Sequence, residues 1–169
     1  MFQIQTKRLE IRPFTEQDLD AFAEIVKDPE VMRFSISGTL SRDGAREYLQ
    51  KRILDHYAKY GYGLWALIDR EERGLVGFAG LITQMIEGEQ MVELGYRLDT
   101  KRWGQGLATE AGQAICRYAF GTLKFSRIIS VIEPNNDRSV RVAERLGMHI
   151  WKKATFHGIS VNLYILENK

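Results

Sequence analysis

The segment KRWGQGLATEA, Lys101 to Ala111, is the most informative part of this sequence. It follows the strand-like run MVELGYRL and opens a helical pattern, so it forms a strand-to-helix turn. Gly104 and Gly106 have no Cβ atom, which lets the backbone approach a ligand closely. The free N–H groups of the first helical turn, with about half a positive charge from the helix dipole, suit a phosphate group. The turn is therefore a candidate diphosphate-binding cradle, with a purely structural tight turn as the alternative.

Two familiar phosphate-binding loops do not match this segment. A Walker A loop ends in Gly-Lys followed by Ser or Thr, and that ending is absent from the segment. A dinucleotide fingerprint requires a third glycine or an alanine where Thr109 stands, with an acidic residue about 20 positions later. A cradle at this position therefore belongs to another class of phosphate site.

The sequence on either side of the cradle predicts a mixed α/β sheet. Apolar or alternating runs indicate seven strands, at 8–14, 64–69, 75–83, 91–98 and 127–132, with two more after residue 146. Helical patterns follow the capping signal Thr15–Asp18 and occupy 41–60, the residues from the cradle to about Gly121, and 136–146. The three strands between 64 and 98 form an antiparallel meander. Strand 91–98, the helix after the cradle and strand 127–132 form a βαβ unit, so these two strands should be parallel. We expect helices on both faces of the sheet.

Composition excludes several other classes of protein. The chain has 169 residues, 44% of them hydrophobic, which suits a single domain over 1–169. Its net charge of +2 is too weak to indicate a nucleic-acid or membrane partner. The longest uncharged stretches, Gly74–Ile86 and Ala154–Leu166, fall short of the roughly 20 apolar residues that span a bilayer. The N-terminus lacks the apolar core of a signal peptide, so we expect a cytoplasmic protein.

Three segments resemble the GNAT superfamily of N-acetyltransferases, and in particular its branch that acetylates ribosomal-protein N-termini at serine or alanine. WGQGLATEA resembles the acyl-CoA-binding motif, with Gly106 and Ala108 at its last two positions and Trp103 in place of the general Gln or Arg. NNDRSVRVAERLGM, 135–148, resembles the second motif of this branch, with Met148 in place of an aromatic residue. The opening TKRLEIRPFTEQDL is also similar. The resemblance covers nearly the whole chain in the right order.

The resemblance implies a mostly antiparallel seven-stranded sheet whose central parallel pair splays apart to admit acetyl-CoA. The backbone of the strand ending at Leu98 would pair with the pantetheine arm, which Asn136 would also contact. The backbone amides of the cradle would hold the diphosphate, namely those of Trp103, Gly104, Gln105, Gly106, Leu107, Ala108 and Thr109. The cradle and Asn136 both follow predicted parallel strands at their carboxyl ends, where ligands bind in open α/β sheets.

Acetyl transfer from a thioester requires a neutral amine, so some group must accept the amine proton. Glu93 is the candidate base, because it shares a strand face with Gly95 and Arg97 and matches the base position of many family members. A carboxylate on a solvated or Arg97-paired sheet face is the alternative. The tyrosine acid that many members place seven residues after the asparagine is Ala143 here. Ser139 is the candidate substitute for protonating the leaving thiolate, with packing or helix capping as the alternative.

The remaining reactive residues favour ordinary structural roles. Cys116 is expected to pack in the helix after the cradle, and a single cysteine cannot form an intrachain disulfide. The three histidines have no metal-ligand spacing, so no metal is expected: His56, His149 and His157. An arginine stripe is expected on a solvated helix face, with a contact to the 3′-phosphate of CoA or to an acidic or RNA partner as the alternative: Arg138, Arg141 and Arg145. Lys101 and Arg102 flank the cradle and are better placed for phosphate.

The sequence thus predicts an acetyl-CoA-dependent N-acetyltransferase in which a primary amine attacks the thioester directly. A protein N-terminal α-amine is the preferred acceptor. A small amine, such as an antibiotic, polyamine or amino acid, is the alternative within the enzyme class. A non-catalytic acyl-CoA-binding module is the alternative outside it. The oligomeric state is left open, a homodimer included.

Overall fold

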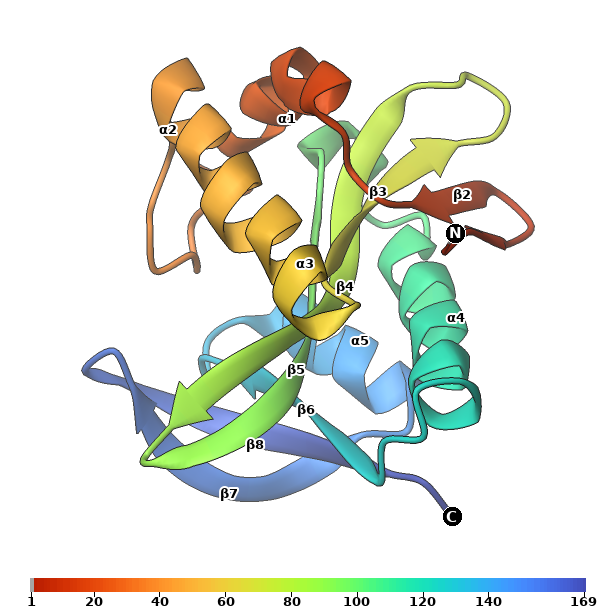
Figure 1. Cartoon of the computed structure of the whole chain (residues 1–169). Helices are drawn as coiled ribbons and strands as arrows, with labels where there is room; N and C mark the ends of the chain where they lie inside the picture. Colours follow the sequence, from red (N-terminus) through yellow and green to blue (C-terminus); the bar gives the residue numbers. More distant parts are fainter. Residues whose placement is uncertain (1) are drawn as a thin grey trace.

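A computed structural model describes residues 2–169, which form one eight-stranded sheet with helices around it (Figure 1). The strands are β1 (Ile4–Gln5), β2 (Leu9–Arg12), β3 (Leu64–Asp69), β4 (Leu75–Ile86), β5 (Glu89–Leu98), β6 (Arg127–Ile132), β7 (His149–Phe156) and β8 (Ile159–Glu167). Their order across the sheet is β1-β2-β3-β4-β5-β6-β8-β7. The predicted count of seven is wrong by one strand. The additional strand is β1, whose two residues are too few to show an alternating pattern.

Five α-helices lie within residues 2–169: α1 (Leu19–Val26), α2 (Arg42–Tyr48), α3 (Asp55–Tyr60), α4 (Leu107–Gly121) and α5 (Asp137–Arg145). A π-helical segment, Leu49–Leu54, joins α2 to α3, so the helix predicted over 41–60 is continuous but widens in its middle. It begins where Gly44 N–H donates to Ser41 Oγ at 3.1 Å and ends at Gly61, whose φ is +75°. Within this part of the chain no helix is long and apolar enough to cross a bilayer.

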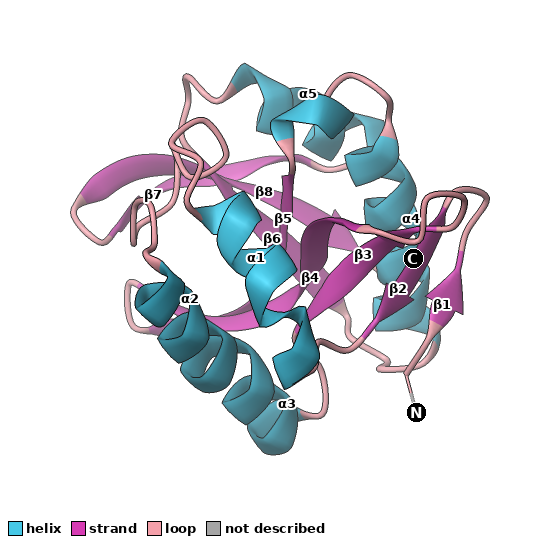
Figure 2. Ribbon diagram, turned by 90° about the horizontal axis from the view of Figure 1, so that it is seen from above, coloured by secondary structure: helices cyan, strands magenta, loops and turns pink. Residues whose placement is uncertain are grey.

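Helices cover both faces of the sheet, as the sequence predicts (Figure 2). On one face, α1 and the α2–α3 helix pack side chains such as Phe22 and Ile53 against Phe78 of β4. On the other face, α4 packs Ile115 and its neighbours against Leu94 of β5. The helix α5 contacts α4 and covers β6 and β8. The two faces of β5 therefore have different surroundings, which decides where its polar side chains lie.

The parallel pair β5–β6 is the feature that positions the site. Every other neighbouring pair in the sheet is antiparallel. In the parallel pair, Glu93 is in register with Ile129. One residue further, Ser130, which is 2% exposed, donates its hydroxyl hydrogen bond to Leu94 O at 2.9 Å. This bond pairs the Leu94 carbonyl, which faces β6. Beyond this point the two strands separate, and the edge of β5 from Gly95 to Leu98 faces the gap between them, which we call the splay.

Candidate active site

The cradle adopts the backbone conformation that its glycines permit. Gly104 has a φ of +73° and Gly106 a φ of +77°, both in the left-handed region that other residues avoid. Gly106 is the N-cap of α4, and the first bond of the helix runs from Glu110 N–H to Gly106 O at 3.0 Å. The N–H groups of Leu107, Ala108 and Thr109 precede that bond and have no carbonyl within the helix. They are oriented along the helix axis as a phosphate site requires.

The turn between β1 and β2 supports the cradle from behind. Glu110 accepts hydrogen bonds from Thr6 Oγ1 at 2.6 Å, Arg8 N–H at 2.8 Å and Arg8 Nε at 2.7 Å. Arg8 Nη1 in turn donates to Gln105 O at 2.7 Å. These bonds tie the TKRL segment to both ends of the turn, so the cradle is held in place before any ligand arrives. The role of this opening motif was not predicted from the sequence.

A first cleft of about 520 Å³ opens in front of the cradle. Its walls include most of the residues predicted to bind acetyl-CoA: Leu98, Trp103, Gly104, Gly106, Leu107, Ala108, Thr109 and Asn136. Gln105 is the exception. Its side chain turns back to donate to Lys101 O at 3.1 Å, and its carbonyl accepts from Arg8. The role of Gln105 is therefore to shape the turn, and the other cradle residues face the cleft.

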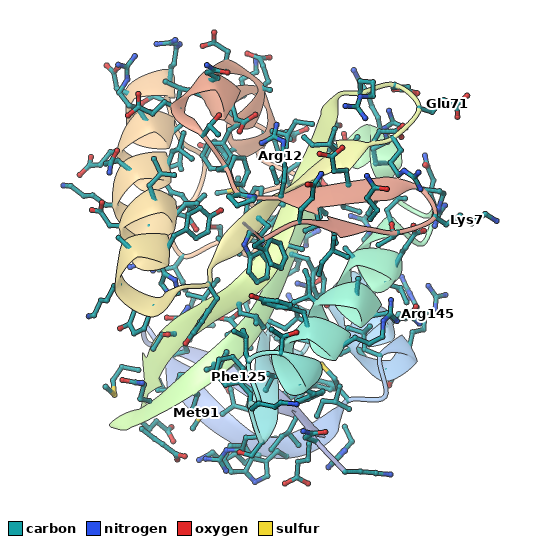
Figure 3. All side chains as sticks on the ribbon, turned by 45° about the vertical axis from the view of Figure 1, so that its right-hand side comes forward. Lys7, Arg12, Glu71, Met91, Phe125 and Arg145 are labelled. Carbon is teal, nitrogen blue, oxygen red and sulfur yellow. The ribbon has the colours of Figure 1, made fainter. Side chains whose placement is uncertain are left out.

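The first cleft is strongly basic. Six arginines line it, Arg33, Arg97, Arg102, Arg138, Arg141 and Arg145, against two carboxylates, Glu30 and Asp137. The arginine stripe on α5 is exposed, as expected, but it also forms a wall of the first cleft. The guanidinium of Arg138 stacks 3.5 Å from the ring centroid of Trp103. Arg145, at the other end of the stripe, is labelled in Figure 3. Arg102 is paired with Asp69 at 3.3 Å and with Glu72, so the α5 stripe is freer to bind phosphate. Arg102 lines the cleft as well, so the prediction that Lys101 and Arg102 are better placed for phosphate stays a prediction.

Two further details fit a phosphate-bearing ligand with a polar amide arm. Thr109 Oγ1 is buried and has no hydrogen-bond partner within residues 2–169, which suits a ligand atom at the start of α4. Leu98 O accepts from Trp103 Nε1 at 3.0 Å, so this carbonyl is already used. By strand alternation, the backbone N–H and C=O of Tyr96 point to the same side as Leu94 O, into the splay. Tyr96 therefore offers the free backbone groups for a pantetheine arm.

A second cleft, of about 400 Å³, adjoins the first along β5 and is lined by Glu93. The side chain of Glu93 is partly buried and accepts a hydrogen bond from Gln84 Nε2 at 2.8 Å. Within residues 2–169 Glu93 forms no ion pair with Arg97, although Arg97 lies close enough to attract its charge. Burial raises the pKa of the Glu93 carboxyl, and the opposing effects of Gln84 and Arg97 are smaller. A carboxylate with a raised pKa is a better proton acceptor.

The two clefts meet at the splay. They share five lining residues: Phe34, Tyr96, Arg97, Asn136 and Ser139. Asn136 is the N-cap of α5, and its Oδ1 accepts from Ser139 N–H at 3.3 Å. Tyr96 OH donates to Ser139 O at 3.1 Å, which anchors the start of α5 to β5. A group bound in the first cleft can therefore reach a group bound in the second beside Ser139.

Tyr96, Gln84 and Arg97 were not predicted as site residues. The sequence showed Tyr96 as one of the apolar residues on a strand, and only the splay reveals its role between the clefts. Gln84 is nine residues before Glu93 and meets it because β4 and β5 pair in register, with Thr83 opposite Val92. The sequence did contain a signal that Arg97 belongs to the site, because strand alternation places it on the same face as Glu93 and Gly95.

Cys116 lies outside both clefts. It is buried among the core residues of α4, and burial raises the pKa of its thiol to about 11. A protonated, enclosed thiol is unreactive. The packing role predicted for this cysteine is confirmed.

The splayed sheet, the glycine cradle and the two joined clefts are the features of an α/β protein that brings two substrates together. The acetyltransferase (GNAT) domain model matches residues 8–149. The chain therefore belongs to the GNAT family of acetyltransferases. It is 32% identical over 145 residues to YnaD of Bacillus subtilis, an uncharacterized N-acetyltransferase, with 86% of this chain and 81% of YnaD covered.

Solved structures agree with this assignment. A GNAT-family acetyltransferase from Bacillus anthracis is 27% identical and has a TM-score of 0.82, with 98% of each chain covered. RimL, described as a ribosomal L7/L12 α-N-protein acetyltransferase in complex with coenzyme A, is 22% identical with a TM-score of 0.80, again over 98% of each chain. At 22% identity, the likeness to RimL shows a shared fold and nothing about the substrate. The predicted α/β class and its parallel pair are confirmed.

Proposed function

We propose that this N-acetyltransferase transfers an acetyl group from acetyl-CoA to the α-amine of a protein N-terminus. The single observation that carries the proposal is the junction of the two clefts, where a basic cradle on one side meets a carboxylate, Glu93, on the other. Acetyl-CoA supplies the acetyl group as an activated thioester. The chain itself holds the two substrates close together, which replaces an unfavourable encounter in solution.

The first cleft fits acetyl-CoA by its charge and its backbone. The amides of Leu107, Ala108 and Thr109 bind the diphosphate, and Arg138 on α5 neutralises phosphate charge. The edge of β5 at Tyr96 pairs with the pantetheine arm, and Asn136 lines the same path at the cleft junction. Gln105 shapes the turn from outside the cleft. These assignments rest on the cradle geometry and the unpaired strand edge.

Glu93 acts as the base that accepts the proton of the attacking amine. An α-amine with a pKa near 8 is about one tenth neutral at pH 7, whereas a lysine side chain is neutral in fewer than about one molecule in a thousand. A single carboxylate is a sufficient base for the α-amine and a weak one for lysine. The bond from nitrogen to the acetyl carbon forms, the carbon–sulfur bond breaks, and Glu93 takes the amine proton.

Ser139 is the proposed donor to the leaving sulfur. It lines both clefts, and its backbone carbonyl is held by Tyr96, so its position at the junction is fixed. The serine hydroxyl donates a hydrogen bond to the sulfur as the carbon–sulfur bond breaks, which stabilises the thiolate that leaves, and the proton taken by Glu93 is released to solvent. Since a CoA thiolate is a fairly good leaving group, Ser139 contributes less to the rate than Glu93.

Labelled acetyl-CoA tests this proposal. The purified chain is incubated with isotopically labelled acetyl-CoA and a cell extract, and mass spectrometry then locates the label. Label on the first residue of one or a few proteins is expected. Label confined to small amines would move the function to small-molecule acetylation. Label in neither fraction, with acetyl-CoA still bound, would favour a binding module and would contradict the proposal.

A further inference from the structure

Arg97 is a cation that lines the second cleft. It shares a face of β5 with Glu93 and Gly95, and it lines both clefts at their junction. Its guanidinium forms no hydrogen bond or ion pair within residues 2–169, and burial lowers its pKa. Six of the other fourteen arginines form ion pairs with carboxylates: Arg8, Arg12, Arg42, Arg73, Arg102 and Arg127.

Arg97 is partly buried, and it is attracted by Glu93 and Tyr48 but forms a hydrogen bond with neither. Partial burial of a cation that has no hydrogen-bonded anion is costly, and an anionic ligand would offset that cost. The surroundings of Arg97 increase this cost. Apolar side chains of Phe34, Phe78 and Ile82 line the same cleft. Arg52 adds a second positive charge to the cleft wall. The carboxylate nearest in sequence on this face, Glu93, is the proposed base and is engaged by Gln84.

The spacing along β5 sets the size of the ligand. Glu93 and Arg97 are four residues apart on one face, so their Cα atoms are separated by about 13 Å. Between them, Gly95 has no side chain, and a Cβ added there would still lie 3.4 Å from Ile82 Cδ1. Both side chains line the second cleft, and their charged groups attract each other, so the two heads lie closer together than the two Cα atoms. What remains between their heads is about one or two extended residues, at roughly 3.5 Å per residue.

We propose that the acceptor carries a carboxylate within about two residues of its reacting amine, and that Arg97 binds this carboxylate while Glu93 faces the amine. The inference rests on the proposed function, because it names the class of amine that the second cleft selects. The carboxylate belongs either to an acidic side chain near a polypeptide N-terminus or to the C-terminus of a very small acceptor. Arginine recognises both by the same paired hydrogen bonds.

Matched acceptors test the inference. One arm compares two peptides amidated at the C-terminus that begin Ala-Glu or Ala-Gln. The other arm compares the dipeptide Ala-Ala with its C-terminal amide. In each arm kcat/KM is measured for the wild-type chain, Arg97→Met and Arg97→Lys. The exposed Arg46→Met serves as the control for a lost positive charge outside the clefts. The Kd for CoA is measured for every variant.

We expect the wild-type chain to prefer the acidic acceptor by about 10-fold or more in at least one arm, as for hydrogen bonds to charged groups. Arg97→Met should reduce this preference to about one, and Arg97→Lys, which keeps the charge, should retain part of it. Arg46→Met should retain it fully. The arm in which the preference appears identifies the source of the carboxylate.

Three results would overturn the inference. The first is a wild-type preference near one in both arms. The second is a preference that survives Arg97→Met. The third is a loss of CoA affinity in Arg97→Met equal to its loss of kcat/KM, which would make Arg97 a cofactor contact. In the first case, acetylation of the neutral peptides would still uphold the proposed function. Acetylation of small acidic amines alone would uphold the inference and contradict the N-terminal acceptor.

Discussion

Replacing Glu93 by glutamine removes the proposed base and leaves the geometry of the second cleft intact. The glutamine carbonyl can still accept the hydrogen bond that Gln84 Nε2 donates at 2.8 Å. A general base typically contributes about 10²- to 10⁴-fold to a rate. We expect the lower end, about 100-fold in kcat at pH 7, because an α-amine needs little help to lose its proton. The Kd for acetyl-CoA should stay within about twofold, because Glu93 lines only the second cleft.

The pH dependence of this variant makes the test sharper. Without a base, the rate follows the neutral fraction of the amine, which rises about tenfold between pH 7 and pH 9 for a pKa near 8. The wild-type chain should gain less over the same range. Steady-state thiol release with one defined peptide measures both profiles. Glu89→Gln is the matched control, because Glu89 lies on the same strand but pairs with Arg127 at 2.5 Å on the exposed hairpin.

The same substitution has a stability signature. The pKa of Glu93 is raised in the folded chain, so its contribution to stability is full below the unfolded pKa and is lost as pH rises through the folded value. Glu93→Gln should therefore raise the melting temperature at pH 8 and change it little near pH 4. Unchanged turnover, together with an unchanged pH profile, would refute the assignment of Glu93 as the base.

Three more substitutions examine the cradle and its support. Gly106→Val should weaken CoA binding by about 10-fold or more. The control is Gly158→Val, because Gly158 has the same φ of +77° but does not line either cleft. It should cost the same backbone strain, about 1–2 kcal/mol, without weakening CoA binding. Equal CoA affinity in these two variants by calorimetry would contradict the cradle. Arg8→Met should raise the KM for acetyl-CoA about 3- to 10-fold with little change in kcat, and an unchanged KM would show that the support is dispensable. Asp18→Asn should cost about 1–2 kcal/mol of stability at pH 7 by breaking the 2.8 Å ion pair with Arg12. Burial opposes ionisation of Asp18, but its hydrogen bonds prevail and lower its pKa. The loss of stability in Asp18→Asn should therefore vanish as pH falls through the folded pKa of Asp18. A loss of stability that persists at pH 2 would exclude the ion pair as its cause.

The sequence was most informative where the local pattern and the tertiary structure agree. The run 127–132 is a buried strand with the bounds predicted from its apolar residues, and α4 begins directly after the glycine turn. Gly104 and Gly106 were assigned from the sequence to the strand-to-helix turn, and the structure gives both of them a positive φ, which few other residues tolerate. These features depend on the backbone of a few consecutive residues.

The features that were missed depend on contacts between distant segments. The arginine stripe of α5 has the pattern of a solvated face, and only the position of α5 beside the cradle makes it a cleft wall. Arg8 lies 102 residues before Glu110, and the hydrogen bond between them depends on the packing of α4 beside β2. The strand β1 was missed because two residues carry no periodicity.

The most direct test of the central claim is thiol release from acetyl-CoA with two versions of one lysine-containing peptide. One version has a free α-amine, and the other has the same sequence with that amine blocked. The account predicts that the free peptide accelerates thiol release by about 100-fold or more over buffer and gains one acetyl group at its first residue. It also predicts no acceleration with the blocked peptide. Equal rates with both peptides, or release no faster than in buffer, would contradict the account.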